Sequence, residues 1–283
     1  MKRIATFFLL FFSLQAFSQE LNDLITPITD TNMDLPGDLF RGSRLGNGHT
    51  TRLSHDGELT MIVSHRFGEI KGGMYELFGL DQATMRIGFE YGFSDRFNLG
   101  FGRSTYQKTY DLFAKYKLFR STGQKPIESA VAGGFSIPTI KNLFPTGNNN
   151  VNDRSSYWGQ LLLAVPLPSF SLQAMPTFLR SNYLPQTGKA NNVFSLGAGA
   201  SARLSKMVSL NVEYYYHISN TYPDASNPLT FGVDIETGGH LFQLIVSNTQ
   251  TMFEKGFLSD NHGHWGDGNI YFGFNLIRVF YLK

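Results

Sequence analysis

The stretch ATMRIGFEYGFSDRFNLGFGRSTYQKTYDLFAKYKL (Ala83–Leu118) alternates apolar and polar residues in three successive runs. In the first run, apolar residues stand at every second position from Met85 to Tyr91, and Arg86 and Glu90 stand between them. A period of two residues is that of a β-strand. Each run spans about 9–11 residues, the length that a tilted strand needs to cross a bilayer. The stretch therefore predicts antiparallel strands of a transmembrane β-barrel.

The N-terminus indicates export. Lys2 and Arg3 precede the apolar run Ile4–Phe12, and small residues end the segment at Ser18. This is the organisation of a secretory signal peptide, so we predict a signal peptide over residues 1–18. The run is too short for a spanning helix, and no other stretch contains eighteen consecutive apolar residues, which excludes helical membrane spans.

Composition narrows the class of protein. The formal net charge is +2, and removal of Lys2 and Arg3 leaves a neutral mature chain, which argues against nucleic acid as a partner. The chain has no cysteine, so a disulfide framework and a thiolate metal site are excluded. Charged residues make up 16% of the chain, below the roughly 25% of soluble domains. A crowded polar lumen inside an apolar, lipid-facing wall fits this composition.

The alternation predicts an all-β fold with twelve strands. Strand one is expected at Glu58–Phe67, strands two to four within Ala83–Leu118, and the others at Ile127–Ile137, Tyr157–Leu167, Phe170–Arg180, Phe194–Leu204, Val208–His217, Leu229–Glu236, His240–Asn248 and Asn269–Leu282. An even number places both termini on one side, as in bacterial single-chain barrels.

The connections favour one orientation. Connections after even-numbered strands are short, whereas most others are longer and rich in Asn, Gly, Pro and Asp, which places the N-terminus in the periplasm. The short connection 105–109 is an exception. A miscounted hairpin would be expected there, or at strands six and seven, where Pro166, Pro168 and Pro176 each remove a ladder donor.

Three segments form the expected domain organisation. Residues 1–18 are the signal peptide and residues 58–283 the barrel. Residues 19–57 between them show no sustained period and contain several Gly and Pro, so they form either a periplasmic tether or a partial plug in the lumen. The aromatic, apolar last strand is similar to the C-terminal signal that barrel-assembly machinery reads during biogenesis, although the chain ends at Lys283.

Several segments resemble a known family. They are RGSRLGNGHTTR (Arg41–Arg52), the block His65–Asp111, and DIETGGHLFQL (Asp234–Leu244). Together with the signal peptide and the last strand, they are similar to Gram-negative outer-membrane β-barrels that form a domain of unknown function. The resemblance covers nearly the whole mature chain. It implies a barrel in the outer membrane, and it carries over no catalytic or ligand-binding residues.

Charged residues on the inward face are the first candidate site. By parity, the lumen-lining charges are Arg86, Glu90, Lys115, Lys117, Glu128, Arg203, Glu213, Asp234 and Glu236. Charges in a narrow lumen must be paired or hydrated. Two readings remain open: a polar pore whose charges select solutes, or an interior filled by ion-paired side chains.

Two histidines in the last outer loop are a candidate metal site. His262 and His264 would face the same way in an extended chain, with Asp260 or Asp267 as possible carboxylate ligands. Two imidazoles do not fill a coordination sphere. We therefore expect no metal and no cofactor.

A hydrolase would need a nucleophile beside a base. His217 and Ser219 have the two-residue spacing found in membrane-barrel phospholipases, but the parity places His217 on the lumen face, whereas such a pair faces lipid. The adjacent Ser64 and His65 point to opposite faces of a strand. No Gly-x-Ser-x-Gly motif occurs elsewhere, so we do not expect an enzyme.

The leading hypothesis is a passive outer-membrane channel or transporter for small solutes. Its inward charges would set selectivity, and residues 19–57 or the loops 68–82 and 249–268 would occlude or gate it. The competing class is a closed structural barrel whose outer loops contact a partner protein or lipopolysaccharide, and an outer-membrane hydrolase is the third. The partners common to these readings are outer-membrane lipid and, during biogenesis, the assembly machinery.

Overall fold

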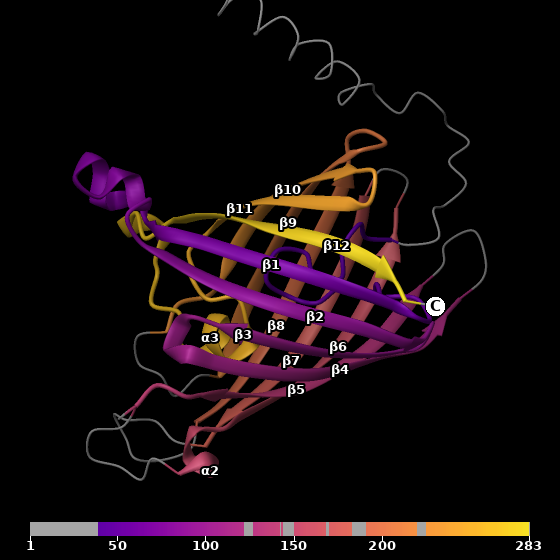
Figure 1. Cartoon of the computed structure of the whole chain (residues 1–283), viewed down its shortest axis with the longest axis horizontal. Helices are drawn as coiled ribbons and strands as arrows, with labels where there is room; N and C mark the ends of the chain where they lie inside the picture. Colours follow the sequence, from indigo (N-terminus) through magenta and orange to yellow (C-terminus); the bar gives the residue numbers. More distant parts are fainter. Residues whose placement is uncertain are drawn as a thin grey trace, which may run out of the picture.

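Twelve antiparallel strands close into a barrel in which β1 pairs with β12 (Figure 1). The computed structural model describes residues 39–121, 127–141, 143, 150–167, 170–182, 191–219 and 225–282. The predicted signal peptide and residues 19–38 lie outside the described residues. The predicted fold class, an antiparallel barrel of twelve strands, is confirmed.

The observed strands follow the predicted ones closely, with ends that differ by a few residues. They are β1 (Glu58–Glu69), β2 (Ala83–Ser94), β3 (Phe97–Ser104), β4 (Thr109–Arg120), β5 (Glu128–Pro138), β6 (Ser156–Pro166), β7 (Phe170–Ser181), β8 (Asn191–Arg203), β9 (Val208–Ser219), β10 (Leu229–Thr237), β11 (His240–Ser247) and β12 (Tyr271–Tyr281).

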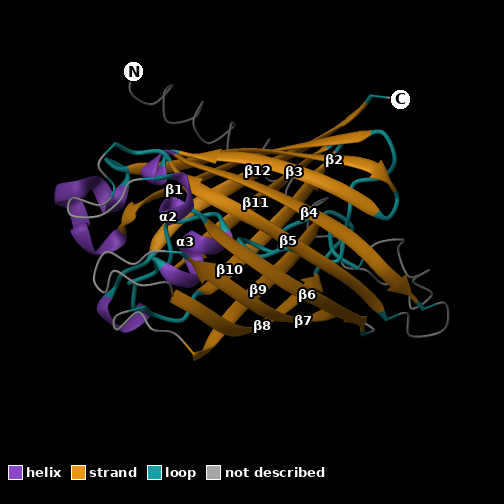
Figure 2. Cartoon of the chain, turned by 90° about the horizontal axis from the view of Figure 1, so that it is seen from below, coloured by secondary structure: helices purple, strands orange, loops and turns teal. Residues whose placement is uncertain are grey.

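The two rims of the barrel differ. One rim carries tight turns such as those of β2–β3 and β10–β11, and the C-terminus lies there (Figure 1). We call it the short-turn end. The opposite rim, the long-loop end, carries η1 (Ile70–Gly79), η2 (Tyr106–Lys108), α2 (Val151–Arg154), α3 (Glu254–Ser259) and η3 (Trp265–Asp267) (Figure 2). No described helix is long and apolar enough to cross a bilayer.

The strand count is correct at the two hairpins where the sequence predicts that a miscount would occur, β3–β4 and β6–β7. Between β3 and β4 the chain reverses through η2, where Gln107 and Lys108 adopt positive φ angles of 49° and 51° and make the connection compact. Between β6 and β7 the ladder is interrupted from Gln160 to Leu163, opposite Pro176. Because proline has no N–H group, it cannot donate to the ladder, yet pairing resumes on both sides of the gap.

The barrel interior is filled from both rims. Two alternatives were open for residues 19–57, a tether or a partial plug; of the described part, residues 39–54 lie inside the barrel, and His55 and Asp56 are exposed (Figures 1 and 2). From the long-loop end, the chain between β11 and β12 enters the lumen and forms α3, most of which is buried. We call residues 39–54 the plug and residues 249–261 the α3 insert.

Candidate functional site

The plug is a small hairpin whose tip lies at Gly46 and Asn47. The amide of Leu45 donates to the carbonyl of Gly48 at 3.0 Å, and the amide of Thr50 donates to the carbonyl of Ser43 at 2.9 Å. A further bridge joins Arg44 to His49. The hairpin therefore satisfies part of its own backbone, and its remaining amides and carbonyls face the barrel wall.

Strands β9, β12 and β1 hold the tip of the plug. Glu213 of β9 accepts hydrogen bonds from the amides of Asn47 at 2.8 Å and Gly48 at 3.0 Å. Asn275 of β12 donates to the carbonyl of Gly46 at 3.0 Å. Arg66 of β1, which has no exposed surface, donates to the Asn47 side chain at 3.0 Å. These contacts fix the tip through groups of both charge signs.

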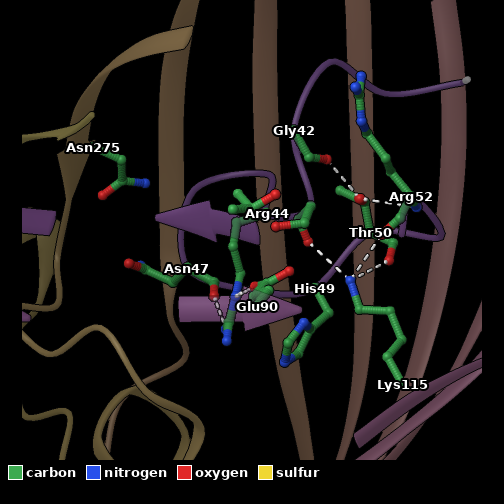
Figure 3. Close-up of polar contacts among 12 residues, drawn as sticks. Gly42, Arg44, Asn47, His49, Thr50, Arg52, Glu90, Lys115 and Asn275 are labelled. Carbon is green, nitrogen blue, oxygen red and sulfur yellow. Dashed lines mark hydrogen bonds and ion pairs between the residues drawn. The ribbon is translucent and has the colours of Figure 1, made fainter. Parts of the chain in front are cut away.

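Lys115 of β4 holds the two arms of the plug together. Its Nζ atom lies 3.3 Å from the carbonyl oxygens of Ser43 and Thr50 and 2.9 Å from that of Arg52 (Figure 3). An ammonium group has three protons to donate, so these carbonyls can use all of them. The inward charge predicted at this position thus binds plug backbone.

Glu254 of α3 joins the two inserts inside the lumen. Its Oε1 atom accepts a hydrogen bond from Arg44 Nη1 at 2.7 Å and lies 3.2 Å from His49 Nε2. Glu90 of β2 lies nearby, 3.8 Å from Arg44 Nε. All four side chains are buried. We call this contact the Glu254 junction; it connects a segment that enters from the short-turn end to one that enters from the long-loop end.

The lumen wall has two sides. Strands β1, β2, β4, β9 and β10 carry buried inward charges, and we call this side the charged half; β6 and β7 form the uncharged half. The inward faces of β6 and β7 carry no charged residue, and they contribute Trp158, Leu162, Met175 and Leu179 to a buried apolar cluster. The plug and the α3 insert complete that cluster with Leu39, Phe40, Leu45, Phe257 and Leu258. Both inserts therefore pack against this half through apolar side chains, and Gln173 of β7 also accepts a hydrogen bond from the amide of Thr51 at 3.0 Å and donates one to the carbonyl of His49 at 2.8 Å.

The nine predicted lumen-lining charges divide into three groups. Glu90, Lys115 and Glu213 are buried and face the inserts. Arg86 forms a buried ion pair with Asp111, and Asp234 accepts a hydrogen bond from Gln243 at 2.9 Å. The remaining charges lie toward the short-turn end: Glu128 contacts Lys117 at 3.2 Å and Arg120 at 3.3 Å, Glu236 pairs with Arg41 of the plug, and Arg203 is half-buried.

Several residues of the site were missing from the predicted set. Arg66 and Asp111 occupy inward positions of β1 and β4, so the period-two alternation could have identified them. Arg44, His49 and Glu254 could not be found in that way, because the plug and the α3 insert lack a strand period.

The structure does not assemble the hydrolase candidate. Within the described chain, no hydrogen bond joins His217 to Ser219, and the amide of His217 donates to Asn227 Oδ1 at 3.0 Å. The metal candidate is not assembled either. Asp260 pairs with Lys255, and no group of three His, Cys, Asp or Glu residues among the described positions could hold a metal ion.

Two cavities open at the short-turn end. One, of about 270 Å³, lies between the plug and strands β1, β10, β11 and β12, and its lining includes Arg41, Arg52, Glu58 and Glu236. The other, of about 290 Å³, is lined by residues that include His55, Arg96 and Lys117. Both cavities have charged walls, so water has access to the rim of the plug from this end.

A family described as "Membrane bound beta barrel domain (DUF5777)" matches residues 40–280. No curated protein matches the chain in sequence.

Among solved structures, the NanC porin is 8% identical, with 79% of this chain and 98% of that chain covered and a TM-score of 0.49. An outer membrane channel from Pseudomonas putida F1 is 12% identical, with 81% and 97% covered and a TM-score of 0.48. Outer membrane phospholipase A from Escherichia coli is 8% identical, with 80% and 93% covered and a TM-score of 0.39. At these values the similarities carry no information about transport or catalysis.

Proposed function

The chain belongs to the family of membrane-bound β-barrel domains that matches residues 40–280, and from that premise we propose that it is a gated channel for small polar solutes. A closed antiparallel barrel is the architecture of proteins that span the bacterial outer membrane, and this chain is located there. In the described conformation the plug and the α3 insert occupy the lumen, and under this proposal a solute would pass after one of them moves.

The observation that carries this proposal is the polar contact between the plug and the charged half of the wall. Hydrogen bonds between the plug backbone and the side chains of Glu213, Lys115 and Asn275 hold the plug there. Water can replace such bonds at small net cost, because intramolecular and water-mediated hydrogen bonds differ little in free energy. This side of the plug is therefore suited to open without unfolding the barrel.

Buried polar atoms along the same contact support a hydrated path. Arg44 Nη2 and Arg66 Nε have no hydrogen-bond partner within the described residues. Buried polar groups are normally satisfied by protein or by water, so these guanidinium groups would hydrogen-bond to water that enters between the plug and the wall. Both signs of charge line this half, which favours small polar solutes over solutes of one charge sign.

Single-channel conductance in a planar bilayer tests the proposal. The refolded mature chain should show rare openings, and Glu254→Ala should open more often, because it removes the carboxylate that lies nearest to the buried Arg44. Lys255→Ala is the matched control, since Lys255 lies on the same helix and pairs with Asp260 rather than with the plug. A heat-modifiability gel verifies that each chain is folded.

A chain that lacks residues 39–54 completes the test and distinguishes the gated channel from the second candidate function. The apolar cluster formed by the inserts and by β6 and β7 favours a permanently closed barrel that serves as a structural or partner-binding element. Sustained conductance of the shortened chain would support the gated channel. A folded barrel without current steps in all of these variants would contradict it and support the closed barrel.

We further propose that the chain is not an enzyme. Within the described residues no hydrogen bond joins His217 to Ser219, which supports this proposal. The hydrolase reading has a direct test: lipid-ester cleavage by the purified barrel that disappears in both His217→Ala and Ser219→Ala would establish it and overturn ours.

A further inference from the structure

The η1 segment at the long-loop end has an inverted distribution of side chains. Tyr75 is 93% exposed and Met74 is 73% exposed, and Leu77, Phe78 and Leu80 are each about half exposed. In contrast, the carboxylate of Glu76 folds back over Gly72. A loop surrounded by water would show the opposite arrangement, with polar groups outward and large apolar groups covered.

The backbone holds these apolar groups outward. Leu77 and Phe78 adopt positive φ angles of 45° and 53°, a region that bulky residues rarely occupy and that is maintained only where the surroundings compensate its cost. The segment is also tied to the rim: Ile70 N donates to Ile270 O at 2.9 Å, and Lys71 Nζ lies 2.7 Å from Glu69 Oε2. The exposure is therefore part of a defined conformation.

The apolar surface of η1 continues the lipid-facing surface of the barrel. Figure 1 shows η1 just beyond the ends of β1 and β2, outside the lumen. On the outward face of those strands, His65 and Phe67 lie with ring centroids 4.5 Å apart, and Met85 is opposite His65. Aromatic residues at this height of a barrel mark the boundary between acyl chains and headgroups.

We propose that η1 inserts Met74, Tyr75 and Phe78 into the outer leaflet of the membrane around the barrel, at the boundary of headgroups and acyl chains. Tyrosine suits this boundary because its ring is apolar and its hydroxyl is polar. A specific protein interface uses about 20–30 residues on each side, more than the five exposed apolar side chains of this segment provide. Lipid is therefore the occupant that the surface fits.

Spin labelling tests the insertion, and the absence of cysteine from the chain makes every label position unique. The full mature chain with Tyr75→Cys carries a nitroxide and is refolded into phosphatidylcholine vesicles. Leu244→Cys, which is 54% exposed on the outward face of β11, serves as the lipid reference. Gly238→Cys serves as the water reference, because a Cβ at this turn position would contact nothing within 4 Å.

Collision rates with oxygen and with a water-soluble nickel complex are measured for each label. The proposal predicts that the label at position 75 collides several-fold more with oxygen than with nickel, as at position 244. A label at position 75 that behaves as at position 238 would overturn it. If Tyr75→Cys fails the heat-modifiability test, Phe78→Cys replaces it with the same expected outcomes. The result does not depend on conductance, so it is independent of the channel proposal.

Discussion

At the scale of single residues, the plug is attached largely through its backbone. Glu213 accepts from two plug amides and Lys115 donates to three plug carbonyls. Such bonds require a close approach between the plug and the wall. Gly48 permits it, because a Cβ at this position would collide with the Tyr215 hydroxyl and would lie 3.1 Å from Glu213 Oε2.

Gly48→Ala is therefore expected to displace the tip of the plug. The displaced hairpin would expose Arg41, Arg44 and Arg52 to trypsin, and mass spectrometry of the digested barrel would detect cleavage at these sites. Gly159→Ala is the control, since a Cβ there meets nothing within 4 Å. Equal resistance of both variants to trypsin would show that the close approach at Gly48 does not hold the plug in place.

Lys115→Met is expected to reduce the free energy that holds the plug against the wall by about 2 kcal/mol, because hydrogen bonds to a charged group are lost while the side-chain volume is nearly kept. This change corresponds to roughly 25-fold faster hydrogen exchange of the Thr50 amide, which is bonded to Ser43 in the hairpin. Exchange is measured by mass spectrometry. Lys117→Met, which removes a charge that pairs with Glu128 outside the plug, should leave this amide unchanged.

At the scale of elements, the α3 insert explains why β6 is apolar on both faces. Its sequence LLLAV places Leu161 and Leu163 toward lipid and Leu162 toward the lumen. A barrel with an open polar lumen would need polar residues at the inward positions. Here Leu162 belongs to the same buried cluster as Phe257 and Leu258 of α3, so the apolar inward face of β6 packs against an inserted helix.

Phe257→Ala is expected to loosen the packing of α3 against the lumen wall. Phe257 is completely buried, and its ring centroid lies 5.3 Å from that of Tyr215, so truncation would destabilise the inserted state by about 3–5 kcal/mol. The amide of Asp260, which donates to Gly256 within the helix, should then exchange much faster. Phe257→Leu, which largely conserves volume, should have a smaller effect. Comparable exchange in wild type and Phe257→Ala would mean that other contacts seat the helix.

At the scale of the whole molecule, closure of the barrel and occlusion of its lumen rest on different contacts. The ladder between β1 and β12 extends from Glu58 to Glu69 and closes the barrel without the plug. The plug and the α3 insert contact the inner wall but contribute no strand to the ladder that closes the barrel. The two inserts meet at the Glu254 junction, so movement of one changes the contacts of the other.

Removal of residues 39–54 is accordingly expected to leave a closed barrel. The shortened chain should keep the fast migration of a folded barrel on an unheated gel, because all twelve strand pairings remain. The inward charges Lys115 and Glu213 would then be hydrated by the open lumen rather than buried. Loss of the fast-migrating form would show that the plug is needed for closure. A mature chain with Gly266→Ala, where a Cβ meets nothing within 4 Å, controls for refolding yield.

The sequence by itself determined the barrel. The period of two residues specifies which face of each strand meets lipid, because one apolar face repeats over twelve segments of spanning length. The same parity predicts inward positions for charges such as Glu90 and Glu213, and applied to every strand it would also have predicted them for Arg66 and Asp111. These predictions need only local information, since a side chain's face in a strand is decided by its position alone.

Only the tertiary structure decided what those charges contact. Residues 39–54 and 249–261 have no strand period, so nothing local predicts that they enter the lumen from opposite ends and meet at Glu254. Whether Lys115 lines an open pore or binds a plug depends on a segment more than sixty residues away in the chain. Contacts of that kind arise from packing between distant segments, and the alternation within a single strand does not predict them.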